Sequence, residues 1–305
     1  PGQNSFRAVS LNSQRTESEA DEITVNYSVV ANNVPVVVKP VNNNAAIVDT
    51  INKDATLHLI VVGINEYQNK SMSLNYAIAD ATSFKEELEK DSKTILANIK
   101  TYFVTNSTAD KTAITNAFKT VQQNAKAQDV FIFYYAGHGV IGKDKEFYLV
   151  PTDVSDLKNV QTELEQKGIA SKLLQQYAID IQAQKQLFIL DACQSAGAFE
   201  KLLSNDGDQQ KSLAVVARST GTHWMAASGA MQYANEFSSL GHGVFTYVLL
   251  QALKGEAANN KMITVNGLKS FLQVQVPMLM KKYNGAAQYP ASYGLGNDFP
   301  VQVLK

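Results

Sequence analysis

Residues 129–139 read DVFIFYYAGHG. After Asp129 this stretch runs through apolar and aromatic residues only, and such a continuous run is typical of a strand covered on both faces. The run then meets Gly137, His138 and Gly139, where glycine lets the backbone turn sharply and lets a substrate approach closely. In open α/β sheets, ligand sites lie where strands end, so this stretch predicts a site at the end of a buried strand.

Segments on either side alternate between short apolar runs, which predict strands, and helical spacing of apolar residues, which predicts helices. Strand and helix in alternation indicate right-handed crossovers and an α/β/α sandwich around a mainly parallel sheet. An apolar segment at residues 222–228 follows a polar loop. The expected strands are residues 57–64, 100–104, 129–136, 146–151, 186–192 and 300–304, and the expected helices are residues 75–90, 109–127, 171–181, 243–253 and 265–282.

Residues 1–38 differ from the rest, because β-branched and alternating stretches flank a polar segment, as in a hairpin. Two or three strands do not bury a core alone. We expect this β-rich segment to be the end of an upstream sandwich module in a longer chain, or strands docked on the main domain; a disordered tail is the alternative. Residues 39–56 are rich in Pro and Asn and predict a linker, which leaves residues 57–305 as the main domain.

The composition is that of an ordinary globular protein, with 45% hydrophobic residues, 18% charged residues and a net charge of −1. This charge gives no bulk attraction to nucleic acid or to an anionic membrane, and neither is expected as a partner. No apolar run approaches the ~20 residues that a membrane helix needs. The one cysteine excludes an intrachain disulfide framework and any multi-cysteine metal site. We expect a cytoplasmic protein, although one cysteine is also compatible with secretion.

The only cysteine lies in QLFILDACQSAG, residues 186–197, directly after a second buried strand. A thiol is a useful nucleophile only as thiolate, and a nearby imidazole favours that form. Cys193 follows His138 by 55 residues, which is enough for a strand, a helix and a strand. Either residue alone would be interpreted as a packing residue. Together, at the ends of strands and beside small residues, they predict a Cys–His pair at one edge of the sheet.

The histidine also lies in GHGVIGKD, residues 137–144, which nearly matches the phosphate-loop pattern GxxxxGK[ST] and follows a strand. A nucleotide hydrolase is therefore an alternative class. Two features disfavour it. Asp144 lacks the hydroxyl that would hold magnesium, and the chain next enters a strand pattern where a phosphate loop needs a helix.

The other histidines are assigned structural roles. His242 lies in a second GHG and is a rival for catalysis, but it precedes a helix, and a helix N-terminus disfavours protonated imidazole. His58 and His223 lie inside apolar strand runs and are expected to be packing residues. No GxSxG elbow occurs, which disfavours a serine hydrolase of that type. No group of His and carboxylate residues has metal-ligand spacing, so no metal site is expected.

Several stretches together resemble the caspase-like cysteine peptidases, most closely the bacterial homologues (orthocaspases) and the metacaspase and paracaspase branches. The stretches are VVGINEY with LNYAIADA, FIFYYAGHG, FILDACQSAG and AASGAMQYANE with GHGVFTYVLL, and they occur in the family's order over about residues 57–305. The resemblance implies a caspase-like three-layer sandwich, with a large-subunit-like part at 57–200 and a small-subunit-like part at 220–305.

The resemblance also implies the chemistry. Cys193 would attack the peptide carbonyl, His138 would protonate the leaving amine, and the N–H groups of Gly139 and Cys193 would form the oxyanion hole. Asp191 and Ser195 stand where the caspase pattern has Gln and Gly. No cofactor is needed; some metacaspases require calcium, and no calcium-binding cluster is matched here. A catalytically silent scaffold is a further alternative, which the intact pair disfavours.

In the metacaspase and paracaspase branches the specificity pocket is acidic, and Asp80 and Asp191 match its two positions, with Glu236 as a further contributor. A half-buried carboxylate favours a cationic partner, and arginine offers a bidentate one. The resemblance thus implies a protein or peptide substrate with Arg or Lys before the cut bond. The alternatives are a helix-face residue for Asp80 and a strand-end cap for Asp191.

The segment 199–223 begins polar and carries Lys201, Lys211 and Arg218. The loop between the two subunit-like parts is often cut in the family, and exposed polar loops are favoured sites of nicking. A preference for basic residues would make these three positions candidates for self-cleavage. Ordinary solvated charges are the alternative.

Overall fold

The fold is described from a computed structural model, in which two compact units are distinguished, Pro1–Ala45 and Ala46–Lys305. In the first unit, β1 (Gly2–Ala8) and β2 (Asp21–Tyr27) form an antiparallel pair, as the β-rich pattern of the N-terminal segment predicts. The residues that the structure describes are 2–8, 21–27, 51–91, 95–155, 161–192, 222–228, 236–237, 239–283, 285, 287–294 and 297–304.

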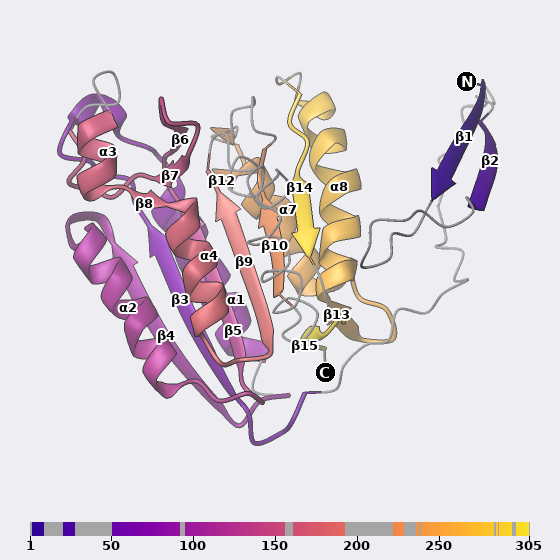
Figure 1. The fold of residues 1–305 in the computed structure, drawn as a ribbon, viewed down its shortest axis with the longest axis horizontal. Helices are drawn as coiled ribbons and strands as arrows, with labels where there is room; N and C mark the ends of the chain where they lie inside the picture. The colour runs from indigo at the N-terminus through magenta and orange to yellow at the C-terminus, as the bar shows by residue number, and fades with distance from the viewer. Residues whose placement is uncertain are drawn as a thin grey trace, which may run out of the picture. The chain divides into compact units, whose positions relative to one another are not determined.

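A six-stranded sheet forms the centre of the second unit, with β5 in its interior (Figure 1). Its order is β14-β10-β9-β5-β3-β4, and every neighbouring pair is parallel except β10 and β14. All residues of β5 are buried, as a strand covered on both faces requires. The bounds are β3 (Thr56–Gly63), β4 (Asn98–Thr105), β5 (Val130–Ala136), β9 (Lys185–Asp191), β10 (Thr222–Ala226) and β14 (Ala291–Gly294).

Helices cover both faces of this sheet, which confirms the predicted three-layer α/β/α sandwich. Successive side chains of a strand point to opposite faces, so Phe133 and Tyr135 of β5 enter one core cluster, and Ile132 and Tyr134 enter the other. The first face is covered by α2 (Lys111–Asn124) and α4 (Ser171–Asp180), and the second by α1 (Ala77–Asp91), α7 (Val244–Gln251) and α8 (Val265–Lys282).

The short elements were not all expected, because strands of two to four residues show too little periodicity to be recognised. The helix predicted at 243–253 is observed as α7, which is followed directly by a π-helical segment, Ala252–Glu256. Gly255 in this segment has a φ of 120°. No helix within the described ranges is long and apolar enough to cross a membrane. The remaining elements are η1 (Lys70–Met72), η3 (Asn106–Thr108), β6 (Gly139–Ile141), β7 (Phe147–Leu149), α3 (Gln161–Lys167), β8 (Ile169–Ala170), β11 (Glu236–Phe237), β12 (His242–Gly243), β13 (Met262–Thr264) and β15 (Pro300–Val303).

The carboxyl ends of three neighbouring strands lie level with one another. Gly63 of β3 pairs with Ala136 of β5, which pairs with Asp191 of β9. The N–H of Gly137 then donates to the carbonyl of Asp191 at 3.2 Å. The segment that carries His138 and the segment that leads to Cys193 therefore leave the sheet from adjacent strands at one edge.

Residues 137–144, which resemble a phosphate loop, lead into a β-hairpin. Gly139–Ile141 forms β6, and it pairs antiparallel with β7. A phosphate loop instead leads into a helix whose N-terminus faces the phosphates. The observed hairpin therefore disfavours the nucleotide-hydrolase alternative.

A partly buried contact between His223 and Lys269 joins β10 to α8. Lys269 Nζ donates to His223 Nδ1 at 2.8 Å, and His223 Nε2 donates to the carbonyl of Asn297 at 3.0 Å. Burial, reinforced by the charge of Lys269, lowers the pKa of His223 to about 4. A Cβ on Gly294 of β14 would clash with His223 Nδ1, so the neighbouring strand requires glycine there. His223 is thus buried in a strand, as expected, but it also forms specific polar contacts.

We predict that acidification destabilises the protein through His223. Its pKa is about 4 when folded against an ordinary value of 6.5, so the unfolded chain takes up the proton first as the pH falls. The free energy of unfolding should therefore fall below pH 6.5, by roughly 2 to 3 kcal/mol at pH 4.5 from this residue. Urea denaturation at pH 7 and pH 4.5 measures the loss. His223→Gln should show a smaller difference between the two pH values, and an equal difference would contradict the assignment.

Candidate active site

His138 is held at the carboxyl end of β5, and its ring is oriented by a backbone carbonyl. Its Nε2 lies 2.6 Å from the carbonyl oxygen of Met72, at the end of η1. A carbonyl oxygen only accepts hydrogen bonds, so Nε2 carries the hydrogen in this arrangement. Nδ1 is then the ring nitrogen that can take up a proton. The side chain is only partly buried, which leaves the ring accessible for proton transfer.

The loop that supplies the Met72 carbonyl is organised by the side chain of Asn65. Asn65 Oδ1 accepts from the N–H of Ile78 at 3.0 Å, and its Nδ2 donates to the carbonyl of Asn75 at 3.1 Å. The N–H of Asn65 donates in turn to Asn106 Oδ1 at 3.0 Å. Polar side chains in turns commonly bond to nearby backbone in this way. This loop was not predicted from the sequence, although the asparagine after the apolar run of β3 was a visible signal.

Gly139, the predicted oxyanion-hole residue, opens the hairpin β6–β7. The N–H of Val150 donates to the carbonyl of His138 at 3.0 Å, and the N–H of Gly142 donates to the carbonyl of Glu146 at 2.7 Å. Hydrogen-bonded and non-hydrogen-bonded pairs alternate along an antiparallel ladder. Gly139 therefore falls in a non-hydrogen-bonded position, where its N–H points away from β7.

Asp80, the first of the two predicted pocket carboxylates, is buried in the first turn of α1 with 3% of its surface exposed. Its Oδ1 accepts from His242 Nδ1 at 2.7 Å, and its Oδ2 accepts from the N–H of Gly243 at 3.1 Å. Asp80 is thus not an exposed helix-face residue. His242, expected to be structural, is its partner, a contact that was not predicted from the sequence.

Asp191, the second predicted pocket carboxylate, is the last residue of β9 and is 8% exposed. Its Oδ2 accepts from the hydroxyl of Thr246 at 2.5 Å, and the Tyr134 hydroxyl lies 2.5 Å from Thr246 Oγ1. Since the Thr246 hydrogen goes to the carboxylate, Tyr134 donates to Thr246. Burial, with the charges of Asp191 and Asp80, holds the pKa of Tyr134 well above its usual range, so the phenol stays a donor.

The remaining predicted residues are described only in part. Glu236 pairs through its backbone with Gly243, beside the amide that contacts Asp80. Ala192 directly precedes Cys193, and its carbonyl accepts from the hydroxyl of Ser228 at 3.3 Å. Within the described ranges no group of three or more His, Cys, Asp or Glu residues could hold a metal ion. The predicted residues that lie outside the described ranges are Cys193, Lys201, Lys211 and Arg218.

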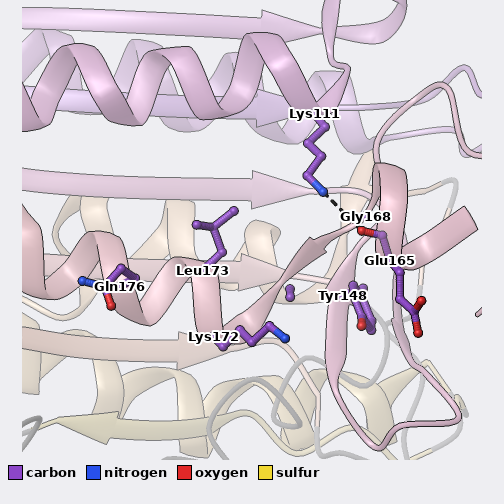
Figure 2. A pocket seen from close by; sticks show the side chains of 8 residues that line it. Lys111, Tyr148, Glu165, Gly168, Lys172, Leu173 and Gln176 are labelled. Carbon is purple, nitrogen blue, oxygen red and sulfur yellow. Dashed lines mark hydrogen bonds between the residues drawn. The ribbon is translucent and has the colours of Figure 1, made fainter. Parts of the chain in front are cut away.

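A separate cavity of about 450 Å³ opens between α2, α3, α4 and the strands β7 and β8 (Figure 2). Lys111 reaches across it, and its Nζ donates to the carbonyl of Gln166 at 2.8 Å. None of the predicted site residues that the structure describes lines this cavity, and His138 is not among its lining residues. Its lining residues are Lys111, Tyr148, Glu165, Gly168, Ala170, Lys172, Leu173 and Gln176.

Comparison with known proteins gives the family. A family model described as "Caspase domain" matches residues 57–295. The crystal structure of protein GSU0716 from Geobacter sulfurreducens is similar in fold, with a TM-score of 0.56 at 14% identity over 82% of this chain and 100% of that chain. No curated protein matches the chain significantly. The matched residues run from the start of β3 to the end of β14 and include the ends of both β5 and β9, and the chain therefore belongs to the caspase-domain family.

Proposed function

We propose that the protein is a cysteine endopeptidase that hydrolyses peptide bonds after Arg or Lys. The caspase-domain match supports a cysteine peptidase. The observation that carries the proposal is the geometry of His138, whose Nε2 hydrogen is directed to the Met72 carbonyl 2.6 Å away. The adjacent strand β9 leads through Ala192 to Cys193, so nucleophile and base arise from neighbouring strands.

In the proposed reaction, His138 Nδ1 takes the proton of the Cys193 thiol, and the thiolate attacks the carbonyl carbon of the scissile bond. The new C–S bond leaves an oxyanion that accepts from the N–H groups of Gly139 and Cys193. The C–N bond then breaks, and the imidazolium gives its proton to the leaving amine. Water hydrolyses the thioester with His138 as base, which restores the free thiol. No cofactor takes part in these steps.

The preference for Arg or Lys is supported by the surroundings of Asp80 and Asp191. Both carboxylates are buried, and the donors that contact them include a hydroxyl, a backbone N–H and an imidazole. Such hydrogen bonds stabilise the ionised carboxylate. A substrate guanidinium or ammonium would compensate this buried negative charge, whereas an acidic or apolar side chain would not.

A catalytically silent scaffold is the second candidate function, and no observation favours it. The hydrogen bond of His138 Nε2 to the Met72 carbonyl leaves Nδ1 to take up a proton, which supports a working base. Cleavage of a small arginine-containing peptide separates the two candidates, because a scaffold would leave it intact.

The first prediction concerns the dyad. Cys193→Ala should abolish peptide cleavage and labelling by iodoacetamide, because the chain has no other thiol. His138→Ala should lower kcat by about 10²- to 10⁴-fold, the usual contribution of general acid–base catalysis. The measurement is release of a fluorophore from an Arg peptide, with circular dichroism as a check of folding. His242→Ala tests the rival histidine and also removes a donor from Asp80. A His138→Ala protein with the wild-type kcat, beside a His242→Ala protein without activity, would reverse the assignment of the base.

A second prediction concerns specificity. Asp191→Asn keeps the shape and an acceptor for Thr246 but removes the charge. Loss of one charge-assisted contact should cost about 2–4 kcal/mol in the transition state. The value of kcat/KM for an Arg peptide should therefore fall tens- to hundreds-fold, with a smaller effect on a Leu peptide. Asp180→Asn, at the C-terminal end of α4, is the control. Faster wild-type cleavage after Asp or Leu than after Arg would refute the pocket assignment.

Self-processing in the 199–223 segment is the third expectation. An enzyme that prefers basic residues should cut its own chain after Lys201, Lys211 or Arg218. Mass spectrometry of purified active protein should show fragments that the Cys193→Ala protein lacks. Replacing the three basic residues with Gln should remove those fragments while peptide cleavage persists. Identical intact masses for the active and Cys193→Ala proteins would rule the idea out.

A further inference from the structure

The backbone N–H of His138 donates to the hydroxyl of Tyr67, with a nitrogen–oxygen distance of 2.8 Å. Tyr67 follows β3 and is 1% exposed, and its ring centroid lies 4.8 Å from that of His138. A buried backbone N–H needs a partner. His138 lies where the chain leaves β5, so a side chain supplies the partner that a strand would otherwise provide.

The carbonyl of the same residue is bound by a second tyrosine. The hydroxyl of Tyr135 donates to the His138 carbonyl at 2.8 Å and also lies 2.9 Å from the carbonyl of Val150. Tyr135 is the penultimate residue of β5 and is fully buried. Burial holds its pKa well above the usual range, so the hydroxyl remains a hydrogen-bond donor.

The two tyrosines thus bind both polar groups of the His138 backbone. Tyr67 accepts from the N–H, and Tyr135 donates to the carbonyl. We call Tyr67 and Tyr135 the tyrosine clamp.

The space inside the clamp explains Gly137. A Cβ at this position would lie 2.7 Å from the Tyr135 hydroxyl oxygen and 2.9 Å from the Tyr67 hydroxyl oxygen. Real side chains essentially never approach so closely, so any larger residue would push the hydroxyls apart. The clamp therefore requires glycine, which has no Cβ, at the position before His138.

We propose that the tyrosine clamp positions His138 for proton transfer, by fixing its backbone while the Met72 carbonyl fixes its ring. This inference rests on the proposed function and deepens it, because it names two positioning residues that do not touch the reacting atoms. With the backbone and the ring of His138 both held, the direction of Nδ1 is determined. Released from the clamp, the backbone could rotate and carry Nδ1 away from the thiol, and misplacement on this scale is costly to catalysis.

The test uses Tyr67→Phe, Tyr135→Phe and the double variant, which keep the rings and remove the hydroxyls. For an Arg peptide we expect kcat to fall roughly 10- to 100-fold, with KM within about twofold of the wild type. The double variant should lose little more than either single variant, because either loss already releases one of the two backbone groups that hold His138. The pH profile of Cys193 alkylation by iodoacetamide should shift in all three, since it reports the thiol–imidazole pair.

Tyr177→Phe is the matched control. Tyr177 lies in the same core cluster, is 6% exposed and stacks on Phe118. The control should keep the wild-type kcat and alkylation profile, and thermal unfolding of all variants shows how much stability each loses. A clamp variant whose kcat and alkylation profile match the wild type would overturn the inference. A loss of kcat that merely tracks the loss of stability, in the control as in the clamp variants, would overturn it as well.

The same measurements distinguish failure of the proposed function from failure of the clamp. A wild-type protein that cleaves no peptide, with a thiol no more reactive than free cysteine, would overturn the peptidase and the clamp together. An active wild type with unaffected Phe variants would overturn the clamp alone. Reduced kcat at unchanged KM in both Phe variants, with a normal Tyr177→Phe protein, would support both.

Discussion

The complete burial of β5 is the constraint on which the rest of the structure depends. A strand with every residue buried must have both faces covered and both edges hydrogen-bonded, which demands β3 and β9 beside it and helices on either side. Because successive side chains of β5 point to opposite faces of the sheet, neighbouring residues contact different groups. Tyr135 faces the α2 and α4 side and holds the backbone of His138, whereas Tyr134 faces the α1 and α7 side and supports Thr246 beside Asp191.

The start of α7 connects the two buried carboxylates. His242 and Gly243 bind Asp80 of α1, and Thr246 binds Asp191 of β9. These donors come from the C-terminal part of the chain, while both carboxylates come from the part before residue 200. Electrostatics thus couples the two buried carboxylates to the docking of α7, since removal of the donors would leave them with fewer hydrogen bonds.

Much of the sandwich and the placement of His138 could be predicted, because they rest on local signals. The apolar run at 129–136 became β5, and the helical spacing at 265–282 became α8. The carboxyl ends of parallel strands meet at one edge, so His138 and the segment before Cys193 were expected together. Short strands such as β6 and β8 and the helix α3 were missed, because their lengths show little periodicity.

Residue type and spacing depend only on neighbours in the chain, so they were enough to predict the fold class, the family resemblance and the candidate residues. Tertiary structure alone decided which groups contact those residues. Tyr67 and Met72 lie about 70 positions before His138, and His242 lies 162 positions after Asp80, yet each pair is in hydrogen-bond contact. A hydrogen bond requires two atoms within about 3 Å in the right direction, and only the folded chain brings together groups so far apart in sequence.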